Sequence, residues 1–460
     1  MDERAAGLAH QLQQLVVAPP GAAAVDGGGA AAAGTQGYTA ATQPTGNAGG
    51  VSSDATWDFL TNAAHMFERP VELAEITPAD IRRGYDLQGY RWSGCELQKQ
   101  MYISYRREVY PQYQCVPHDV RDVRRAATCV DPTASFYSFR YAVTGDDYRC
   151  KVSHFQLRDL VWATSSYDVF FWHAEGVQCW NPWRGTRQCV LGRREMPESF
   201  RLSSMCADRG IVFAGDYQGR FCVKSLWAGG AAATGSLAPS AADDIANHAT
   251  PANLRGHAPQ VMVAQNRGHV RCLDVQQLRV TDDAQFDWAV NCTALTQSAS
   301  LGCVVGDSTE GLLTDPRQQH RVVARLHGHR DYSFTCAFSP DERLVATGNQ
   351  DTSVRVYDVR WPQTSLATLC GYIGAMRIVK FSPCGRYLLA AEPADNVHIY
   401  DTATFGTAQD IEFLGEVAGA TFSPDANCVF IGISDAIHAD GLVEYTSVSP
   451  GSSASCDPWL

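Results

Sequence analysis

Short apolar runs separated by polar turns fill the second half of the chain. The clearest unit lies at residues 326–358, LHGHRDYSFTCAFSPDERLVATGNQDTSVRVYD. Three apolar runs are divided here by clusters of Gly, Ser, Pro, Asn and Asp, a pattern that is typical of β-strands joined by tight turns. The pattern predicts three antiparallel strands, with Phe338 closing the first and Asp358 closing the third.

The same unit recurs at a nearly constant interval. Phe-Ser-Pro begins at Phe338, Phe381 and Phe422, which are 43 and 41 residues apart. The aspartates that close a strand follow a similar period, at Asp274, Asp315, Asp358 and Asp401. A four-stranded sheet that cannot bury both faces alone must pack against copies of itself, so the repeat predicts an all-β fold with the blades of a propeller.

The repeat divides the chain into four regions. We expect a disordered Ala/Gly-rich tail at 1–56, a helical basic extension that packs on the propeller at 57–131, a seven-bladed propeller at 132–447 and a disordered tail at 448–460. The later blades are predicted at 286–327, 328–370, 371–414 and 415–447. The first is predicted to hold strands at 151–156, 159–164, 168–173 and 176–181, and a long low-complexity loop is expected at 228–250.

The extension combines a helix pattern with many arginines. Residues 93–96, Ser-Gly-Cys-Glu, form a capping-box pattern, and Leu97, Met101, Tyr105 and Val109 follow as one apolar stripe that ends before Pro111. Three arginine pairs are candidates for docking an acidic partner: Arg82, Arg83, Arg106, Arg107, Arg124 and Arg125. The alternative, which we favour, is a helix whose arginines pair with the acidic propeller surface.

Composition limits the classes of partner. A net charge of −12 and a pI near 5.5 argue against nucleic acid as the main partner. No run of about 18 apolar residues predicts a membrane span, and the acidic start lacks the core of a secretory signal. The 16 cysteines contain no C-x-x-C pair, so we expect reduced thiols in a cytoplasmic or nuclear protein, with organellar import left open.

Motifs for chemistry are sparse. No Gly-x-Ser-x-Gly elbow and no phosphate-binding Gly-Lys-Ser/Thr loop occur in the sequence. The pair His327 and His329 has no neighbouring Cys or acidic cluster, so a metal site is not expected. We therefore predict no catalytic residues, cofactor or metal, although an enzyme that uses the central channel is kept as an alternative.

The repeat resembles WD-repeat proteins, and the whole pattern resembles an uncharacterised WD-repeat family of plants, algae and fungi. The resemblance covers residues 85–447 and includes HFQLRDLVWATS, AGDYQGRFCVK and the segment Ala-Glu-Pro-Ala-Asp at 391–395. It implies a seven-bladed propeller without a settled activity. The chain departs from many relatives at Tyr357, where they carry Trp.

The resemblance also implies a polar network inside the blade. In WD repeats, residues at the positions of Asp351, His329, Thr347 and Tyr357 form a hydrogen-bonded series in that order. Such a series looks like a catalytic triad, but we interpret it as structural, because it satisfies buried polar groups and makes the blade rigid.

A short motif gives one more specific hypothesis. Tyr357, Asp358 and Arg360 resemble the Trp-Asp-x-Arg motif that, in some propellers, marks substrate receptors of cullin-4 RING ubiquitin ligases. The alternative is an ordinary strand end in which Arg360 pairs locally. The sequence therefore predicts a monomeric, non-enzymatic scaffold for other proteins or peptides, with the ligase receptor as a second hypothesis and the partner unknown.

Overall fold

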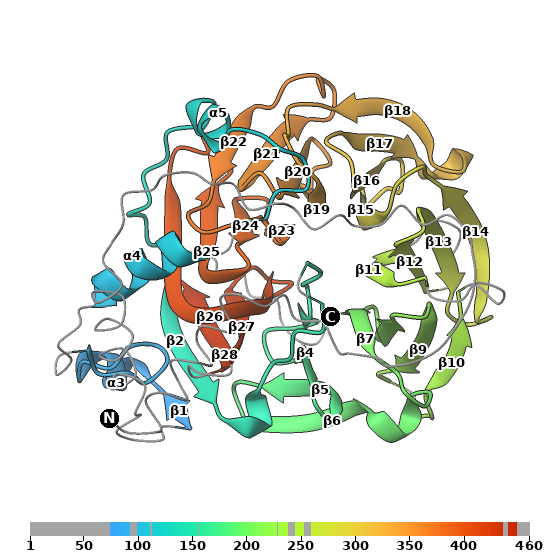
Figure 1. The fold of residues 1–460 in the computed structure, drawn as a ribbon. Helices are drawn as coiled ribbons and strands as arrows, with labels where there is room; N and C mark the ends of the chain where they lie inside the picture. The colour runs from blue at the N-terminus through green and yellow to red at the C-terminus, as the bar shows by residue number, and fades with distance from the viewer. Residues whose placement is uncertain are drawn as a thin grey trace, which may run out of the picture.

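The computed structural model describes residues 74–448, apart from 93–98, 111–112, 155, 228, 238–243, 253–258 and 436–439. Antiparallel sheets stand around a central axis as blades of a propeller (Figure 1). The predicted tail at 1–56 and the capping box lie outside the described residues, as does nearly all of the tail at 448–460. The all-β propeller prediction is confirmed.

Each blade has four strands, and in the first five blades the strands run in sequence order from the channel outward. Blades 1 and 2 are β3 (Val161–Ala163), β4 (Val169–His173), β5 (Gly176–Asn181) and β6 (Thr186–Gly192), then β7 (Leu202–Asp208), β8 (Ile211–Asp216), β9 (Arg220–Ser225) and β10 (Ala233–Ser236). Blades 3 and 4 are β11 (Ala246–Ala252), β12 (Gln260–Gln265), β13 (His269–Asp274) and β14 (Arg279–Gln285), then β15 (Val290–Leu295), β16 (Gly302–Gly306), β17 (Gly311–Asp315) and β18 (Arg321–Leu326). Blade 5 is β19 (Ser333–Phe338), β20 (Leu344–Asn349), β21 (Ser353–Asp358) and β22 (Ala367–Cys370).

Blades 6 and 7 share one long strand. Blade 6 is β23 (Ile378–Phe381), β24 (Tyr387–Ala391), β25 (Ala394–Asp401) and the first half of β26 (Ala408–Phe422). The second half of β26 is the inner strand of blade 7, followed by β27 (Cys428–Ser434) and β28 (Gly441–Ser447). The outer strand of blade 7 is β2 (Tyr137–Thr144), edged by β1 (Glu75–Ile76). A strand that precedes blade 1 in sequence thus closes the ring.

The repeat landmarks occupy equivalent positions. Phe338, Phe381 and Phe422 each end an inner strand. The serine after each phenylalanine donates its backbone N–H to a carbonyl five residues on, at 2.9, 2.8 and 2.9 Å. The predicted strand-closing aspartates end the third strands β13, β17, β21 and β25. The constant interval in the sequence therefore corresponds to one turn geometry repeated around the ring.

The hydrophobic core lies between blades. One cluster joins Val356 and Leu369 of blade 5 to Leu388 and Tyr400 of blade 6. The inner strands also neighbour one another around the channel, from β3 through β7, β11, β15, β19 and β23 to β26. Each sheet is covered by the next, which is the physical reason for the repeat.

Three expectations about strands were wrong. Residues 151–156 form no strand where they are described, and the fourth strand of blade 1 is β6. The expected loop at 228–250 contains β10 and the start of β11, because the backbone of these small residues pairs with β9 and β12, respectively. The last predicted blade, 415–447, contributes only three strands, since β2 supplies the fourth.

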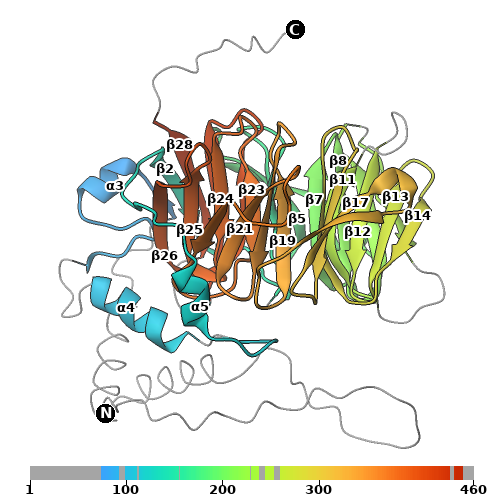
Figure 2. The same ribbon diagram turned by 90° about the horizontal axis from the view of Figure 1, so that it is seen from above.

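Among the residues that the structure describes, three short α-helices lie between β1 and β2: α3 (Pro78–Arg82), α4 (Lys99–Val109) and α5 (Val120–Arg125). Figure 2 shows α4 and α5 on one side of the disc, which we call the helix face. The predicted apolar stripe of α4 was wrong, because Met101 is 56% exposed whereas Tyr102 and Ile103 are 4% and 3% exposed. In the part of the chain that the structure describes, no helix is long and apolar enough to cross a membrane.

Candidate functional site

The predicted network of blade 5 is assembled around the ring of His329. Its Nδ1 lies 3.0 Å from Asp351 Oδ2, and its Nε2 lies 2.9 Å from Thr347 Oγ1. The hydroxyl of Tyr357 donates to the backbone carbonyl of His327 at 2.9 Å. All four side chains of the set are buried. Because a carboxylate only accepts, the ring nitrogen that faces Asp351 carries a proton.

Asp351 is the most heavily bonded member of this set. It also accepts from the backbone N–H of Arg330 at 2.9 Å and from the hydroxyl and N–H of Ser353 at 2.6 and 3.0 Å. Burial alone would raise the pKa of Asp351, but His329 and these hydrogen bonds outweigh burial and lower it to about 2. The carboxylate is saturated by its own blade, which suits a structural role.

A second histidine network, which sequence reasoning missed, lies in blade 6. His398 Nδ1 is 2.7 Å from Asp410 Oδ1, and His398 Nε2 is 2.9 Å from Glu392 Oε1. Glu392 also accepts three backbone N–H groups, from Tyr372, Ile373 and Gly374, at 2.6–2.8 Å. Burial lowers the pKa of His398, but the two carboxylates outweigh burial and raise it to about 9. The ring is therefore a buried cation between two anions.

The segment Ala-Glu-Pro-Ala-Asp at 391–395 supplies both this network and the anchor for α4. Asp395 accepts two hydrogen bonds from the guanidinium of Arg106, at 2.6 and 2.8 Å, and a third from the N–H of Gly415 at 2.8 Å. Arg107 stacks over the ring of Tyr372 at 4.3 Å and pairs with Glu412 at 2.8 Å. These two arginines hold the extension on the propeller.

The six arginines of the predicted basic region do not form one patch. The three pairs lie on or directly after three separate helices, α3, α4 and α5 (Figure 2). Arg83 pairs with Asp80 in α3, and Arg125 pairs with Asp122 in α5 at 2.8 Å. Arg82 and Arg124 are exposed. The pairing of Arg106 and Arg107 with propeller carboxylates corresponds to the alternative that we favoured over a dock for an acidic partner.

The motif of Tyr357, Asp358 and Arg360 spans the C-terminal end of β21 and the start of the turn that follows it. Arg360 donates to both oxygens of Asp358, at 2.9 and 2.6 Å, and its side chain is 66% exposed. This hydrogen bonding lowers the pKa of Asp358 to about 2. The guanidinium is thus held by its own strand end but stays accessible on the surface.

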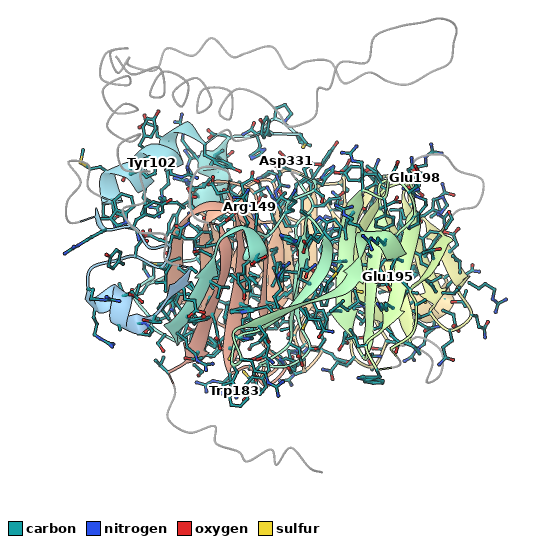
Figure 3. The ribbon with its side chains drawn as sticks, turned by 90° about the horizontal axis from the view of Figure 1, so that it is seen from below. Tyr102, Arg149, Trp183, Glu195, Glu198 and Asp331 are labelled. Carbon is teal, nitrogen blue, oxygen red and sulfur yellow. The ribbon has the colours of Figure 1, made fainter. Side chains whose placement is uncertain are left out.

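Three tryptophans are exposed in turns on the side of the disc away from α4 and α5. Trp183, Trp227 and Trp361 lie in the turns between the third and fourth strands of blades 1, 2 and 5, and they are 68%, 83% and 73% exposed. Figure 3 shows Trp183 on the opposite side of the disc from Tyr102 and Asp331. Tyr167 lies beside Trp183, with ring centroids 6.2 Å apart. We call this the aromatic face, defined by Tyr167, Trp183, Trp227 and Trp361.

A group of polar side chains converges on the central channel from different blades. Asp159, just before β3, lies 2.5 Å from Lys380 Nζ of β23 and 3.5 Å from His248 Nε2 of β11. The ammonium of Lys380 also lies 4.4 Å from the centre of the Trp162 ring. Asp159 has a positive φ of 77°, which is uncommon for a residue other than glycine. Sequence reasoning missed this group, because the ring closure alone brings its members together.

The described residues contain no group of three or more His, Cys, Asp or Glu side chains arranged to hold a metal ion. The fourteen cysteines among them are free thiols.

Comparison with known proteins matches one segment to a repeat family. Residues 320–358 match the family model described as WD domain, G-beta repeat. The chain is 30% identical over 103 residues to DDB1- and CUL4-associated factor 10 of Homo sapiens, which covers 22% of this chain and 18% of that protein. It is 22% identical over 292 residues to Uncharacterized protein C4G3.03 of Schizosaccharomyces pombe, which covers 60% of this chain and 81% of that one.

The matches to the first curated relatives span 16–18% of the length of those proteins. A solved structure, the WD40 beta propeller domain of Doa1, superposes with a TM-score of 0.54 at 16% identity and covers 68% of this chain and 97% of that one. At this identity the likeness concerns the fold. Together, the repeated blade, the matched segment and the superposition show that this chain has the fold of a WD-repeat β-propeller.

Proposed function

We propose that the protein is a non-enzymatic scaffold that binds other proteins through its aromatic face. The observation that carries this proposal is the exposure of three tryptophans on turns of the same side of a rigid disc. Exposed aromatic residues supply much of the binding energy at protein interfaces when a partner covers them. Turns held by a rigid fold are also common places for binding residues.

The contacts on the helix face also favour the aromatic face as the binding surface. There the chain's own segment occupies part of the face, because Asp331 accepts the N–H groups of Cys115 and Val116 at 3.0 and 3.2 Å. Gln350 also donates to the carbonyl of Tyr113 at 2.6 Å. A partner at this site would have to displace those contacts, whereas the aromatic face presents its side chains directly to solvent.

The test compares two surface variants with the wild type. A variant with Trp183→Ser and Trp361→Ser removes two apolar side chains from the aromatic face. The control variant, with Arg82→Ser and Arg124→Ser, changes two exposed residues of the helical extension. After affinity purification and mass spectrometry, a protein recovered by the wild type and the control but lost by the tryptophan variant supports the proposal. Equal recovery by all three proteins contradicts it.

A second candidate is a substrate receptor of a cullin-4 RING ubiquitin ligase. It rests on the exposed guanidinium of Arg360 beside Trp361, and on the similarity to DDB1- and CUL4-associated factor 10. An arginine at an interface can form two parallel hydrogen bonds to a carboxylate, which makes it a strong contact. The motif residues Tyr357 and Asp358 would then position Arg360.

Binding of purified DDB1, after which that relative is named, tests this candidate. We expect Arg360→Ala to weaken binding by about tenfold or more, which is the effect of one interface arginine. Arg343→Ala is the matched control, because Arg343 is also an exposed arginine of blade 5. Failure of the wild type to bind DDB1 would rule out the ligase role and leave the scaffold proposal standing.

The remaining features of the proposal follow from the sequence. We propose a monomer without cofactor, active in the cytoplasm or nucleus, that does not use nucleic acid or membranes as its main partner. The region boundaries at residues 56, 131 and 447 stay predictions. The enzyme alternative would rest on the channel group of Asp159, His248 and Lys380.

A further inference from the structure

Two arginines are buried at the end of the channel that opens on the helix face. Arg377 comes directly before β23, the inner strand of blade 6, and Arg158 comes shortly before β3, the inner strand of blade 1. They are 6% and 5% exposed. Figure 3 places Asp331, which comes just before the inner strand β19, on the helix face. The equivalent positions before β23 and β3 lie at the same end of the channel.

The guanidinium of Arg377 has few partners. Its Nη2 donates to Gln350 Oε1 at 3.0 Å, and its central carbon lies 4.1 Å from the centre of the Phe334 ring. Its Nε and Nη1, which carry more than half of the N–H bonds of a guanidinium, have no hydrogen-bond partner among the described residues. In that part of the chain no carboxylate accepts from Arg377. A buried cation with unused donors is costly, so this group calls for an anion.

Arg158 is held only loosely by a carboxylate. Its Nη1 and Nη2 lie 3.4 and 3.3 Å from the carboxylate oxygens of Glu416. These distances exceed the roughly 2.7–2.9 Å of a strong charge-assisted hydrogen bond. The Glu416 side chain is 48% exposed, so water weakens the pair further. The Nε of Arg158 has no partner among the described residues. Arg158 therefore also keeps a donor that a ligand can use.

The two guanidinium groups repel each other. Burial and the charge of Arg158 lower the pKa of Arg377 to about 9. Burial and the charges of both arginines lower the pKa of His154 to about 4. At pH 7 Arg377 is thus still a cation, while His154 is neutral. We call these three residues the basic cluster. It carries two positive charges and no negative charge, in a chain whose net charge is −12.

The basic cluster reaches solvent along its edge. Arg158 contacts the half-exposed side chain of Glu416. A cavity of about 320 Å³ begins beside His154, because Tyr217, one of the residues that line it, has its ring centroid 5.9 Å from that of His154. The cavity is also lined by Arg201, whose guanidinium lies 4.6 Å over the Tyr217 ring. Positive charge at this opening attracts small anions, whereas a folded partner is too large to reach the buried donors.

We propose that Arg377 and Arg158 bind a small oxyanion at the helix-face end of the channel, with Nε and Nη1 of Arg377 as its main donors. The ligand class is inorganic phosphate or a small carboxylate, because guanidinium groups form strong hydrogen bonds to both. A bound anion would neutralise the buried charge of Arg377 and reduce its repulsion with Arg158. The site lies at the opposite end of the disc from the aromatic face and does not depend on the proposed scaffold function.

Isothermal titration calorimetry of the full-length protein tests the proposal, with inorganic phosphate in one arm and acetate in the other, at constant ionic strength. We expect the wild type to bind at least one of them with a Kd of about 1 mM or less. Arg377→Met should weaken binding by about tenfold or more, which is the effect of losing hydrogen bonds from a charged donor.

The matched control is Arg201→Met, which removes an exposed arginine from the neighbouring cavity. Because its charge is screened by solvent, the affinity should stay within about threefold of the wild type. Binding of phosphate alone would identify a doubly charged ligand, and binding of acetate would identify a carboxylate. Either result supports the site if Arg377→Met abolishes it.

Thermal unfolding gives a second readout. Phosphate at about 10 mM should raise the Tm of the wild type by about 1–2 °C relative to chloride of equal ionic strength, since a ligand stabilises the state that binds it. The Tm of Arg377→Met should not respond. The concentration is kept low because phosphate at high concentration stabilises folded proteins in general.

Three results would overturn the proposal. They are the absence of binding of either anion by the wild type up to about 10 mM, equal affinity of the wild type and Arg377→Met, and a loss of affinity in Arg201→Met as large as that in Arg377→Met. The first result needs no variant, so the proposal stays falsifiable even if Arg377→Met does not fold.

Discussion

Blades 5 and 6 carry different polar networks on the same frame. His329 of blade 5 and Tyr372 of blade 6 are 43 residues apart, as are Arg355 and His398, so each pair occupies equivalent positions. In blade 5 the histidine enters from the loop before the inner strand and bonds to Asp351 and Thr347. In blade 6 the histidine lies on the third strand between two carboxylates.

The two networks differ in what they contact outside their own blade. The blade 5 network is saturated within its own blade and corresponds to the segment that the WD repeat model matches. The blade 6 network reaches outward, because Tyr372 donates to Asp410 at 2.5 Å and carries the guanidinium of Arg107 over its ring. The blade that departs from the repeat is therefore the blade that anchors α4 through Arg106 and Arg107.

The largest effect is expected from removing Glu392. Glu392→Ala would leave the buried His398 cation and three backbone N–H groups without their shared acceptor. Breaking a buried ion pair in this way costs roughly 3–5 kcal/mol. Urea unfolding measures the loss, and Glu392→Gln should lose less because it keeps one acceptor oxygen. A loss below that of the Asp351→Ala variant would contradict the view that blade 6 carries the more charged network.

A smaller loss is expected in blade 5. Asp351→Ala removes the acceptor of His329 and of two backbone N–H groups, at a cost of roughly 1–3 kcal/mol. Asp351→Asn, which keeps an acceptor oxygen, is the matched control. An unchanged melting temperature for Asp351→Ala would refute the structural role of this network.

The two blades should also differ in their response to pH. The folded pKa of His398 is about 9, above the value of about 6.5 in an unfolded chain. Its contribution is therefore fully present below about pH 6.5 and is lost as the pH rises through about 9, by roughly 1–3 kcal/mol. The titratable groups that face the ring of His398 include Glu392, Asp410 and Tyr372, and Arg107 lies over the ring of Tyr372.

Unfolding by urea at a series of pH values tests this expectation. His398→Gln should remove most of the decline in stability between pH 6.5 and pH 9, since a glutamine has no charge to lose. The same decline in the wild type and in His398→Gln would assign the pH dependence to another group.

The smallest of these effects concerns the anchor of α4. Arg106→Ala removes two hydrogen bonds to the buried Asp395, whose third bond to Gly415 stays. Because Arg106 is partly exposed, we expect a loss of only about 1 kcal/mol, together with faster amide exchange in α4. Arg124→Ala, at an exposed arginine of α5, should change stability by less than about 0.5 kcal/mol. Equal exchange of α4 in the two variants would contradict the anchoring role of Arg106.

The ring could be predicted from the sequence because its signals are local. The phenylalanines at 338, 381 and 422 and the aspartate that ends each third strand mark turns whose geometry depends only on nearby residues. The outer strand of blade 7 was harder to recognise. The segment 415–447 holds one strand fewer than a blade needs, and the missing strand, Tyr137–Thr144, lies about 300 residues earlier in the chain.

The sites were harder to predict, because they depend on contacts between distant residues. The stripe of α4 was wrong since the helix buries Tyr102 and pairs Arg106 with Asp395, 289 residues away, rather than burying Met101. The channel group joins Asp159, His248 and Lys380, which come from three blades. No local pattern connects such residues, although the segment 391–395 did mark the blade that deviates.

Hydroxyl-radical footprinting of the wild-type protein tests the central claim most directly, namely that the chain's own helical segment covers part of the helix face and leaves the aromatic face open. The account predicts rapid oxidation of Trp183, Trp227 and Trp361 and strong protection of Tyr102. Oxidation of Tyr102 at a rate similar to that of Trp183, or protection of all three tryptophans, would contradict it.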